Sequence, residues 1–101
     1  MHIITKKRLL EAAKNHPNAE SKIAFWYNVA KAAVWNNLVE TRNSFAHADQ
    51  VTVKSGRTVT IFNISNDYRL ITAIHYNRKK VFILRFLTHQ EYARGKWKDF
   101  L

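Results

Sequence analysis

The spacing of apolar residues changes once along this chain, and that change limits the folds open to it. Up to about Asn37 the apolar residues recur three or four positions apart, a pattern typical of helices. After Gln50 they alternate with polar residues, a pattern typical of strands with one buried face. The chain is therefore predicted to have an α+β fold. We expect two N-terminal helices, then a three- to four-stranded, mainly antiparallel sheet and a short C-terminal helix.

The two helices are marked by residues that begin and end such segments. Thr5, a residue type that caps helices, precedes the first helix, and Pro17 closes it. Asn18 offers a second N-cap, with Glu20 in the first turn of the helix that follows. The apolar stripe of this second helix consists of Ile23, Trp26, Tyr27, Ala30 and Val34.

Two apolar segments leave alternatives open. In the second helix, Phe25, Val29 and Ala32 lie off the main stripe. This face is either buried or in contact with a partner, and burial is the favoured interpretation. Near the start of the chain, Ile3 and Ile4 form either a short edge strand or an extension of the first helix.

The sheet is predicted from the second half of the chain. Residues 38–50 are expected to form an irregular connector anchored by Phe45. Strands are expected over residues 51–54, 57–64, 68–77 and 80–88. The joints between the last three strands are short enough for antiparallel hairpins. A closing helix is expected over residues 90–97, where Gly95 frays or ends it.

The size and charge of the chain restrict its class. At 101 residues we expect one domain over residues 1–101. Seventeen Lys and Arg against seven Asp and Glu give a formal net charge of +10, which attracts polyanions such as nucleic acid. No apolar run is long enough to span a membrane and no cleavable signal pattern is present, so a cytoplasmic protein is expected. The chain has no cysteine and its five histidines lack metal-binding spacing, so neither a metal nor another cofactor is expected.

The register of the last hairpin follows from the length of its loop. If residues 78–80 form the loop, Asn77 lies opposite Val81, and the two strands sort into an apolar face and a cationic face. The apolar face, which we expect to meet the core, consists of Tyr68, Leu70, Ile74, Tyr76, Phe82, Leu84 and Phe86. A two-residue loop would instead place Arg85 beside Leu70, where an unpaired guanidinium is costly to desolvate.

The cationic face brings chemically active side chains together. Its members are Arg69, Ala73, His75 and Arg85. In the predicted register Arg69 lies opposite His89, and Arg85 lies opposite Ala73. Cross-strand neighbours are about 5 Å apart at Cβ, so Arg69 and His89 are predicted to reach one phosphate. Tyr92 follows His89 by three residues, a spacing that shares a helix face.

Four of these side chains form the predicted catalytic set: Arg69, Arg85, His89 and Tyr92. Histidine transfers protons near neutral pH, tyrosine holds or orients a proton, and guanidinium groups stabilise the charge on a pentacovalent phosphate. Each residue also has a structural interpretation. Arginines pair with carboxylates on solvated strands, a histidine after a strand caps locally, and a tyrosine packs in a core. Their occurrence together favours metal-free chemistry on phosphodiesters.

A second basic set is predicted to bind RNA phosphates. It consists of Arg78, Lys79 and Lys80 at the last hairpin and Arg94, Lys96 and Lys98 near the C-terminus. Contacts of this kind give an affinity that falls steeply with salt. They supply no cleavage specificity.

A group of short motifs carries a resemblance to a known family. They are Ala48-Asp49, Phe62-Asn63-Ile64, Asn66 before Tyr68-Arg69-Leu70-Ile71, Thr88-His89 and Glu91-Tyr92, with Met1-His2-Ile3-Ile4-Thr5 at the start. In order and spacing, residues 44–97 resemble the HigB family of toxins from bacterial toxin–antitoxin pairs, within the RelE-like group of messenger-RNA endonucleases. Two positions depart from the family pattern. Ser65 stands where a glycine is common, and Ala93-Arg94 where an acidic residue is usual.

The resemblance implies a RelE-like fold and a metal-independent endoribonuclease that cuts messenger RNA, often at the ribosome. It also implies an inhibitory partner, a HigA-type antitoxin with a helix-turn-helix. Attack by the RNA 2′-hydroxyl would leave a 2′,3′-cyclic phosphate, with His89 as general acid or base. Two other classes stay open: a non-catalytic RNA-binding or ribosome-associated module, which 13% aromatic residues also suit, and an interaction domain for an acidic protein. A membrane partner is not expected.

Overall fold

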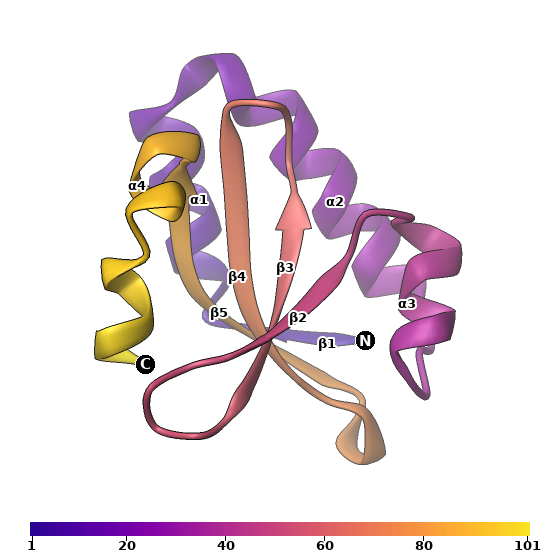
Figure 1. Cartoon of the computed structure of the whole chain (residues 1–101). Coiled ribbons are helices and arrows are strands. Elements are labelled where there is room, and N and C mark those ends of the chain that lie inside the picture. Colours follow the sequence, from indigo (N-terminus) through magenta and orange to yellow (C-terminus); the bar gives the residue numbers. More distant parts are fainter.

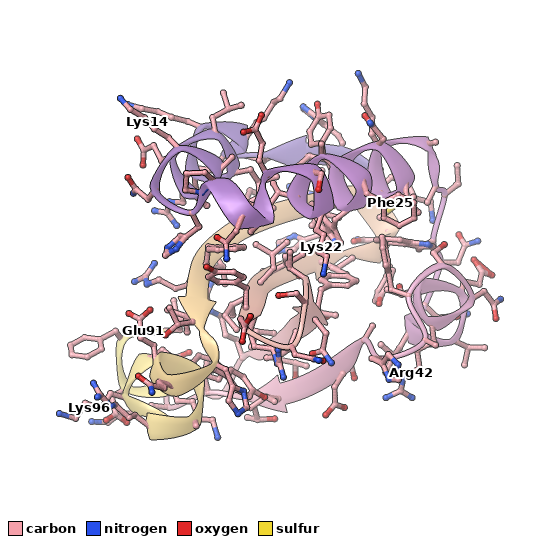
Figure 2. The ribbon with its side chains drawn as sticks, turned by 90° about the horizontal axis from the view of Figure 1, so that it is seen from above. Lys14, Lys22, Phe25, Arg42, Glu91 and Lys96 are labelled. Atoms are coloured by element: carbon pink, nitrogen blue, oxygen red, sulfur yellow. The ribbon has the colours of Figure 1, made fainter.

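The computed structural model describes residues 1–101 and confirms the predicted α+β class (Figure 1). Its elements are β1 (His2–Ile4), α1 (Lys6–Asn15), a 3₁₀ turn (Pro17–Ala19), α2 (Glu20–Ala32), α3 (Leu38–Ser44), β2 (Asp49–Thr52), β3 (Thr58–Asn63), β4 (Tyr68–His75), a 3₁₀ turn (Tyr76–Arg78), β5 (Lys80–Thr88), α4 (His89–Arg94) and a closing 3₁₀ segment (Lys96–Phe100). The five strands form one sheet in the order β1-β5-β4-β3-β2, one strand more than the largest number predicted. Seen from above, α1 and α2 lie on one side of the sheet, and α4 with the closing segment lies on the other (Figure 2).

The extra strand is β1, which decides between the two interpretations of Ile3 and Ile4 in favour of a strand. It runs parallel to β5, and its pairing ends where Ile4 lies opposite Phe82. The Met1 amino group donates to the backbone carbonyls of Ala30, Lys31 and Ala33, and burial lowers the pKa of this amine below 8.0. Because β1 is so short, most of β5 keeps an unpaired outer edge.

The beginnings of α1 and α2 differ from the prediction. Thr5 occupies the N-cap position of α1, but its backbone is left-handed (φ 69°) and its side chain makes no capping hydrogen bond. Asn18 does not cap α2, which begins at Glu20 after a 3₁₀ turn. The Asn18 carboxamide oxygen instead accepts a hydrogen bond from the Tyr68 hydroxyl at 2.9 Å. The Asn18 side chain, which the sequence pattern predicted as a helix cap, therefore makes a tertiary contact instead.

The predicted apolar stripe of α2 is confirmed in part, but the prediction that its second face is buried is wrong. Ile23, Trp26 and Ala30 are buried in the core between the helices and the sheet. Of the second face, Phe25 is 65% exposed, Ala32 is also exposed, and Val29 is half-buried. The sheet meets only one side of α2, and no other element covers the opposite side.

The irregular connector expected over residues 38–50 is wrong, because α3 occupies its first half. Asn37 caps this helix: its side-chain oxygen accepts from the backbone N–H of Glu40 at 2.9 Å. The Glu40 carboxylate accepts in turn from the backbone N–H of Asn36. Phe45 acts as the predicted anchor, with its ring 5.3 Å from that of Phe62 and 6.3 Å from that of Trp26.

The predicted register of the β4–β5 hairpin is wrong. His75 lies opposite Lys80 across a turn formed by residues 76–79, in which Lys79 is left-handed (φ 56°). A β-bulge then leaves Leu84 as an extra residue on β5. As a result Arg69 lies opposite Leu87 and not His89, and Arg85 lies opposite Ile71 and not Ala73.

The corrected register also changes the faces of two residues. Phe82 and Leu84 lie away from α1 and α2: Phe82 pairs with Ala73, and Leu84 packs in a second core on that side. The rest of the predicted core face packs, as expected, with the helices: Tyr68, Leu70, Ile74, Tyr76 and Phe86. Arg69 and Arg85 share the opposite face, as predicted. Arg85 pairs with Ile71, which is two residues from Arg69 on β4 and therefore on the same face.

The second core lies under the C-terminal segment. Its buried members are Val53, Val59, Ile61, Ile71 and Trp97. The predicted break at Gly95 is confirmed, because this residue is left-handed (φ 74°) and ends α4. The closing segment then returns to the sheet, where the Lys98 carbonyl accepts from the backbone N–H of Lys54 at 3.1 Å.

Trp97 is the side chain that closes the second core, so its removal is expected to be costly. It is 6% exposed, stacks on Tyr92 at 5.5 Å and donates its indole N–H to the Tyr92 carbonyl at 3.0 Å. Trp97→Ala is expected to lower the free energy of unfolding by about 3–5 kcal/mol in urea denaturation. Phe100→Ala, at a position 77% exposed, is the control and is expected to change it by about 0.5 kcal/mol or less. Equal losses in the two variants would contradict the role given to Trp97.

Candidate functional site

The start of α4 fixes the position of His89. Thr88 ends β5 and forms a capping box: its hydroxyl accepts from the Glu91 backbone N–H, and the Glu91 carboxylate accepts from the Thr88 N–H. The His89 backbone N–H donates to the carbonyl of Asp67, in the β3–β4 turn, at 2.7 Å. The His89 side chain is exposed and lines a shallow cavity of about 330 Å³ together with Asp67, Tyr68, Thr88 and Gln90. The backbone of His89 is therefore fixed at the rim of the sheet, and its imidazole is open to solvent.

Arg69 is fixed to the same turn from the neighbouring strand. Its Nη1 donates to the carbonyl of Ser65 at 2.8 Å and to that of Tyr68 at 3.0 Å. The guanidinium carbon lies 5.9 Å from the centre of the Tyr92 ring, which stacks in turn on Trp97. No carboxylate pairs with Arg69, and its Nε and Nη2 atoms have no protein acceptor.

These contacts join three of the four predicted catalytic residues to one region, here called the rim cluster: Arg69, His89 and Tyr92. Arg69 contacts Tyr92 directly, and His89 lies one helical turn before Tyr92 in α4. Arg69 and His89 are not cross-strand partners, but both are hydrogen-bonded to the turn between β3 and β4. The arrangement fixes Arg69 and the backbone of His89 to one turn and brings the Tyr92 ring against Arg69.

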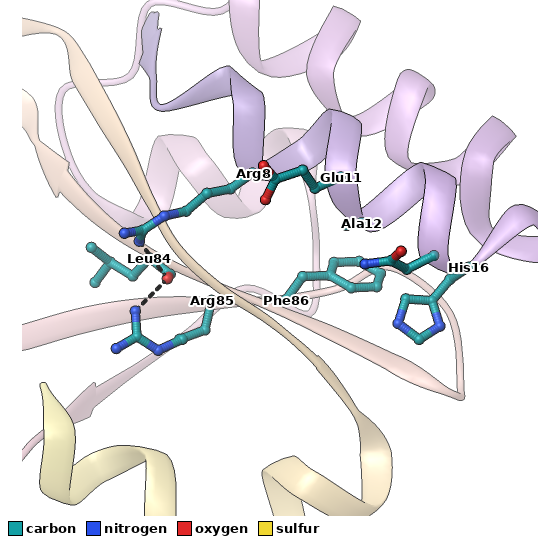
Figure 3. A pocket seen from close by; sticks show the side chains of 8 residues that line it. Arg8, Glu11, Ala12, His16, Leu84, Arg85 and Phe86 are labelled. Atoms are coloured by element: carbon teal, nitrogen blue, oxygen red, sulfur yellow. Dashed lines mark hydrogen bonds between the residues drawn. The ribbon is translucent and has the colours of Figure 1, made fainter.

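Arg85 is placed elsewhere on β5. It is half-buried, and its Nη1 donates to the carbonyl of Leu84 at 2.7 Å. Arg8 of α1 donates to the same carbonyl oxygen, also at 2.7 Å (Figure 3). Both arginines line a cavity of about 340 Å³ between α1 and the outer edge of β5, here called the β5 groove. The fourth predicted residue thus has Arg8 as its neighbour.

The sequence did not identify two residues of this region as candidate site residues. Arg8 reaches β5 across 75 positions of chain, and no local pattern marks such a contact. His16 also lines the β5 groove, with its ring 4.9 Å from Tyr68 and 5.6 Å from Phe86. The only feature of the sequence that marked His16 was its position just before Pro17, at the end of α1.

The six residues predicted to bind RNA differ in their surroundings. Arg78, Arg94, Lys96 and Lys98 are exposed. Lys79 is half-buried, and its amine donates to the Trp35 carbonyl at 3.2 Å and to the side chain of Asn36, so it also ties the hairpin to the segment before α3. Lys80 is half-buried opposite His75.

Very little of the positive charge is neutralised within the protein. The salt bridges are Lys7 with Glu11 at 4.0 Å and Arg42 with Asp49 at 3.4 Å. None of the residues predicted to act on or bind RNA takes part in them. No group of three or more His, Asp or Glu side chains is arranged to hold a metal ion. No helix has both the length and the hydropathy needed to cross a membrane.

The fold and the rim cluster define a small, basic α+β protein with a cationic edge suited to phosphate groups. Residues 19–95 match the family model of the HigB toxin, described as a RelE-like toxic component of a toxin–antitoxin system. The chain belongs to this HigB toxin family.

Similar proteins carry related names. The mRNA interferase HigB of Escherichia coli O6:H1 is 28% identical over 94 residues, which cover 93% of this chain and 90% of that protein. The mRNA interferase HigB of Shigella flexneri is 25% identical over 93 residues, covering 91% and 88% of the two chains. The match extends over nearly the full length of both relatives.

Proposed function

We propose that this protein is the toxin of a type II toxin–antitoxin pair and acts in the cytoplasm as an endoribonuclease on messenger RNA. The observation that carries the proposal is the rim cluster, in which Arg69 lies over the Tyr92 ring and the exposed His89 begins the helix that holds Tyr92. Groups of these types move protons and stabilise charge on phosphorus. Membership of the HigB toxin family, with relatives named mRNA interferases, supports messenger RNA as the substrate.

The proposed reaction uses the 2′-hydroxyl of the RNA as its own nucleophile. This oxygen loses its proton, attacks the adjacent phosphorus and forms a pentacovalent phosphorane. The bond to the 5′-oxygen then breaks, and that oxygen takes up a proton, which leaves a 2′,3′-cyclic phosphate and a 5′-hydroxyl. His89 carries one of the two proton transfers and Tyr92 orients the reacting group. Arg69 stabilises the negative charge on the phosphorane, so the step needs no metal.

The proposed partners follow from the charge and from the family. Ribosomal RNA and messenger RNA are polyanions that the exposed Arg78, Arg94, Lys96 and Lys98 attract. We expect the protein to act at the ribosome and to be inhibited by a HigA-type antitoxin with a helix-turn-helix. Exposed apolar side chains, Leu10 on α1 and Phe25 on α2, offer contact area to such a protein.

Cleavage in the absence of metal tests the proposal most directly. Purified protein is incubated with translating ribosomes in excess EDTA, and new RNA ends are mapped and their chemistry determined. The expected result is cleavage within messenger RNA, with 2′,3′-cyclic phosphate on the upstream fragment. A synthetic RNA with 2′-O-methyl groups throughout is the control and is expected to remain intact, because its nucleophile is blocked.

Other outcomes separate the alternatives. RNA retention without any cleavage, by a folded protein, would favour the non-catalytic RNA-binding module. Cleavage that requires a divalent ion, or that leaves a 3′-hydroxyl, would contradict the proposed reaction. A protein that neither cleaves RNA nor binds it in a salt-dependent way would be an interaction domain for an acidic partner.

A further inference from the structure

The β5 groove lies where the sheet loses its edge strand. β1 pairs with β5 no further than Phe82, and the bulge at Leu84 follows at once. Arg8 donates to the carbonyls of Ile83 at 3.1 Å and of Leu84 at 2.7 Å, so it covers the open edge. Figure 3 shows Arg8 coming from α1 and Arg85 from β5, with their guanidinium groups on either side of the Leu84 oxygen.

Two positive groups thus converge on one neutral acceptor. Each Nη1 atom is 2.7 Å from the Leu84 oxygen, so the two nitrogens are no further apart than twice that distance. The one carboxylate in the groove belongs to Glu11, whose ion pair is with Lys7 and not with either arginine. Convergence of like charges without a counter-ion is unfavourable, and an anion bound between them would relieve it.

The two guanidinium groups also keep free donors. A guanidinium has five N–H groups. Arg8 uses Nη1 for its two carbonyl contacts, and Arg85 uses one N–H of its Nη1. Each therefore retains at least three donors without a protein acceptor, in the planar arrangement that matches phosphate oxygens.

The other end of the groove offers aromatic surface. Phe86 is half-buried, stacks on Tyr68 at 5.3 Å and packs against the His16 ring at 5.6 Å, so the exposed part of the Phe86 and His16 rings lines the groove. Nucleic acid bases stack on rings of this kind without regard to sequence. A paired cationic site next to an aromatic surface fits a nucleotide unit better than a free anion, because it can hold both the phosphate and the base.

We propose that the β5 groove is a second phosphate-binding site that holds the backbone of single-stranded RNA, with one phosphate between Arg8 and Arg85 and a neighbouring base against Phe86 and His16. The proposal rests on the proposed function in taking RNA as the polyanion that the protein binds. Arg85 and Thr88, which precedes His89, are three strand residues apart, or about 10 Å. At this separation the groove is close enough to the rim cluster to take a nearby phosphate of the same strand, and Arg85 serves to bind RNA there.

A binding assay with an RNA that cannot be cut tests this site. A labelled, fully 2′-O-methylated oligonucleotide is titrated with wild-type protein and with Arg8→Gln at several salt concentrations. Arg8→Gln is expected to weaken binding about fivefold and to reduce the slope of log affinity against log salt by about 0.7. Arg57→Gln removes the same charged group from an exposed position in the loop between β2 and β3, and it is expected to bind like wild type. Equal binding by wild type and Arg8→Gln would overturn the proposal.

A measurement on the wild-type protein avoids dependence on how well the variant folds. In NMR spectra, the Nε–H signals of Arg8 and Arg85 are expected to shift when the methylated oligonucleotide is added. Signals that stay in place would overturn the proposal, as would shifts with inorganic phosphate and none with the oligonucleotide. Loss of affinity for an acidic antitoxin in Arg8→Gln, with unchanged RNA binding, would assign the groove to a protein partner and also overturn it.

The oligonucleotide assay separates this inference from the proposed function. Because the methylated strand cannot react, binding is measured apart from cleavage. If Arg8→Gln binds like wild type while His89→Ala abolishes cleavage, the groove fails and the proposed activity stands. If RNA binding behaves as expected but no RNA is ever cut, the proposed activity fails and the groove stands.

Discussion

Replacement of His89 by alanine is expected to lower the rate of RNA cleavage by about 10²- to 10⁴-fold, the range found when a general acid or base is lost. Its side chain is exposed, and its structural hydrogen bond to Asp67 comes from the backbone N–H, which alanine keeps. The fold and the affinity for RNA are therefore expected to be unchanged. The rate is measured under single-turnover conditions, so that the chemical step is observed separately from product release.

His47→Ala provides the matched control for this variant. His47 is also exposed and lies in the segment between α3 and β2. Figure 1 shows α3 and α4 at opposite sides of the molecule. This variant is expected to cleave RNA like the wild type. If His89→Ala retains the full rate, His89 takes no part in proton transfer. The activity would then have to depend on other groups of the rim cluster.

The second large effect is expected at Arg69. Arg69→Gln is expected to lower the single-turnover rate by about 10²- to 10³-fold, as the loss of one preorganised donor to a developing oxyanion does. The Tyr92 ring and the carbonyls of Ser65 and Tyr68 hold this guanidinium in place before substrate binds. The guanidinium therefore does not have to reorganise during the reaction for its remaining N–H groups to donate to the phosphorane.

Arg69→Lys distinguishes charge from geometry at this position. Lysine keeps the positive charge but lacks the planar fork and the stacking on tyrosine, so we expect little recovery of the rate. Thermal unfolding is followed in parallel, since Arg69 also ties the β3–β4 turn to the sheet. A lysine variant with the full wild-type rate would show that Arg69 acts only through its charge at long range.

The sequence predicted element types well because the apolar spacing carries them. The alternation after Gln50 located β3, β4 and β5, and β5 has the predicted bounds. α3 was missed because it is only seven residues long, too short for a periodic apolar stripe. Its start was nevertheless marked, because Asn37 and Glu40 have the spacing of a helix cap.

The register could not be predicted for a different reason. A bulge adds one residue to a strand without a required residue type, so nothing in the sequence around Leu84 signals it. The exposure of Phe25 has a related cause, since the pattern of α2 does not say how many of its sides other elements cover. Both depend on packing between segments far apart in the chain.

The candidate site was predicted at the level of residue types and only in part at the level of contacts. Arg69 and Tyr92 come together although the predicted partner of Arg69 across the sheet was His89. Arg85 lies beside Arg8, which α1 delivers to the far edge of the sheet. Such a neighbour becomes visible only when the path of α1 over β5 is known.

The closing segment has a consequence for the order in which the protein matures during synthesis. Trp97 holds Tyr92 by stacking and by the hydrogen bond to its carbonyl, and Ser55 donates to the Leu101 carbonyl at 2.7 Å. Tyr92, Trp97 and Leu101 follow α1, α2 and all five strands in the chain, so they are synthesised last. During synthesis the chain can thus collapse around its first core while the Tyr92 ring still lacks its support from Trp97.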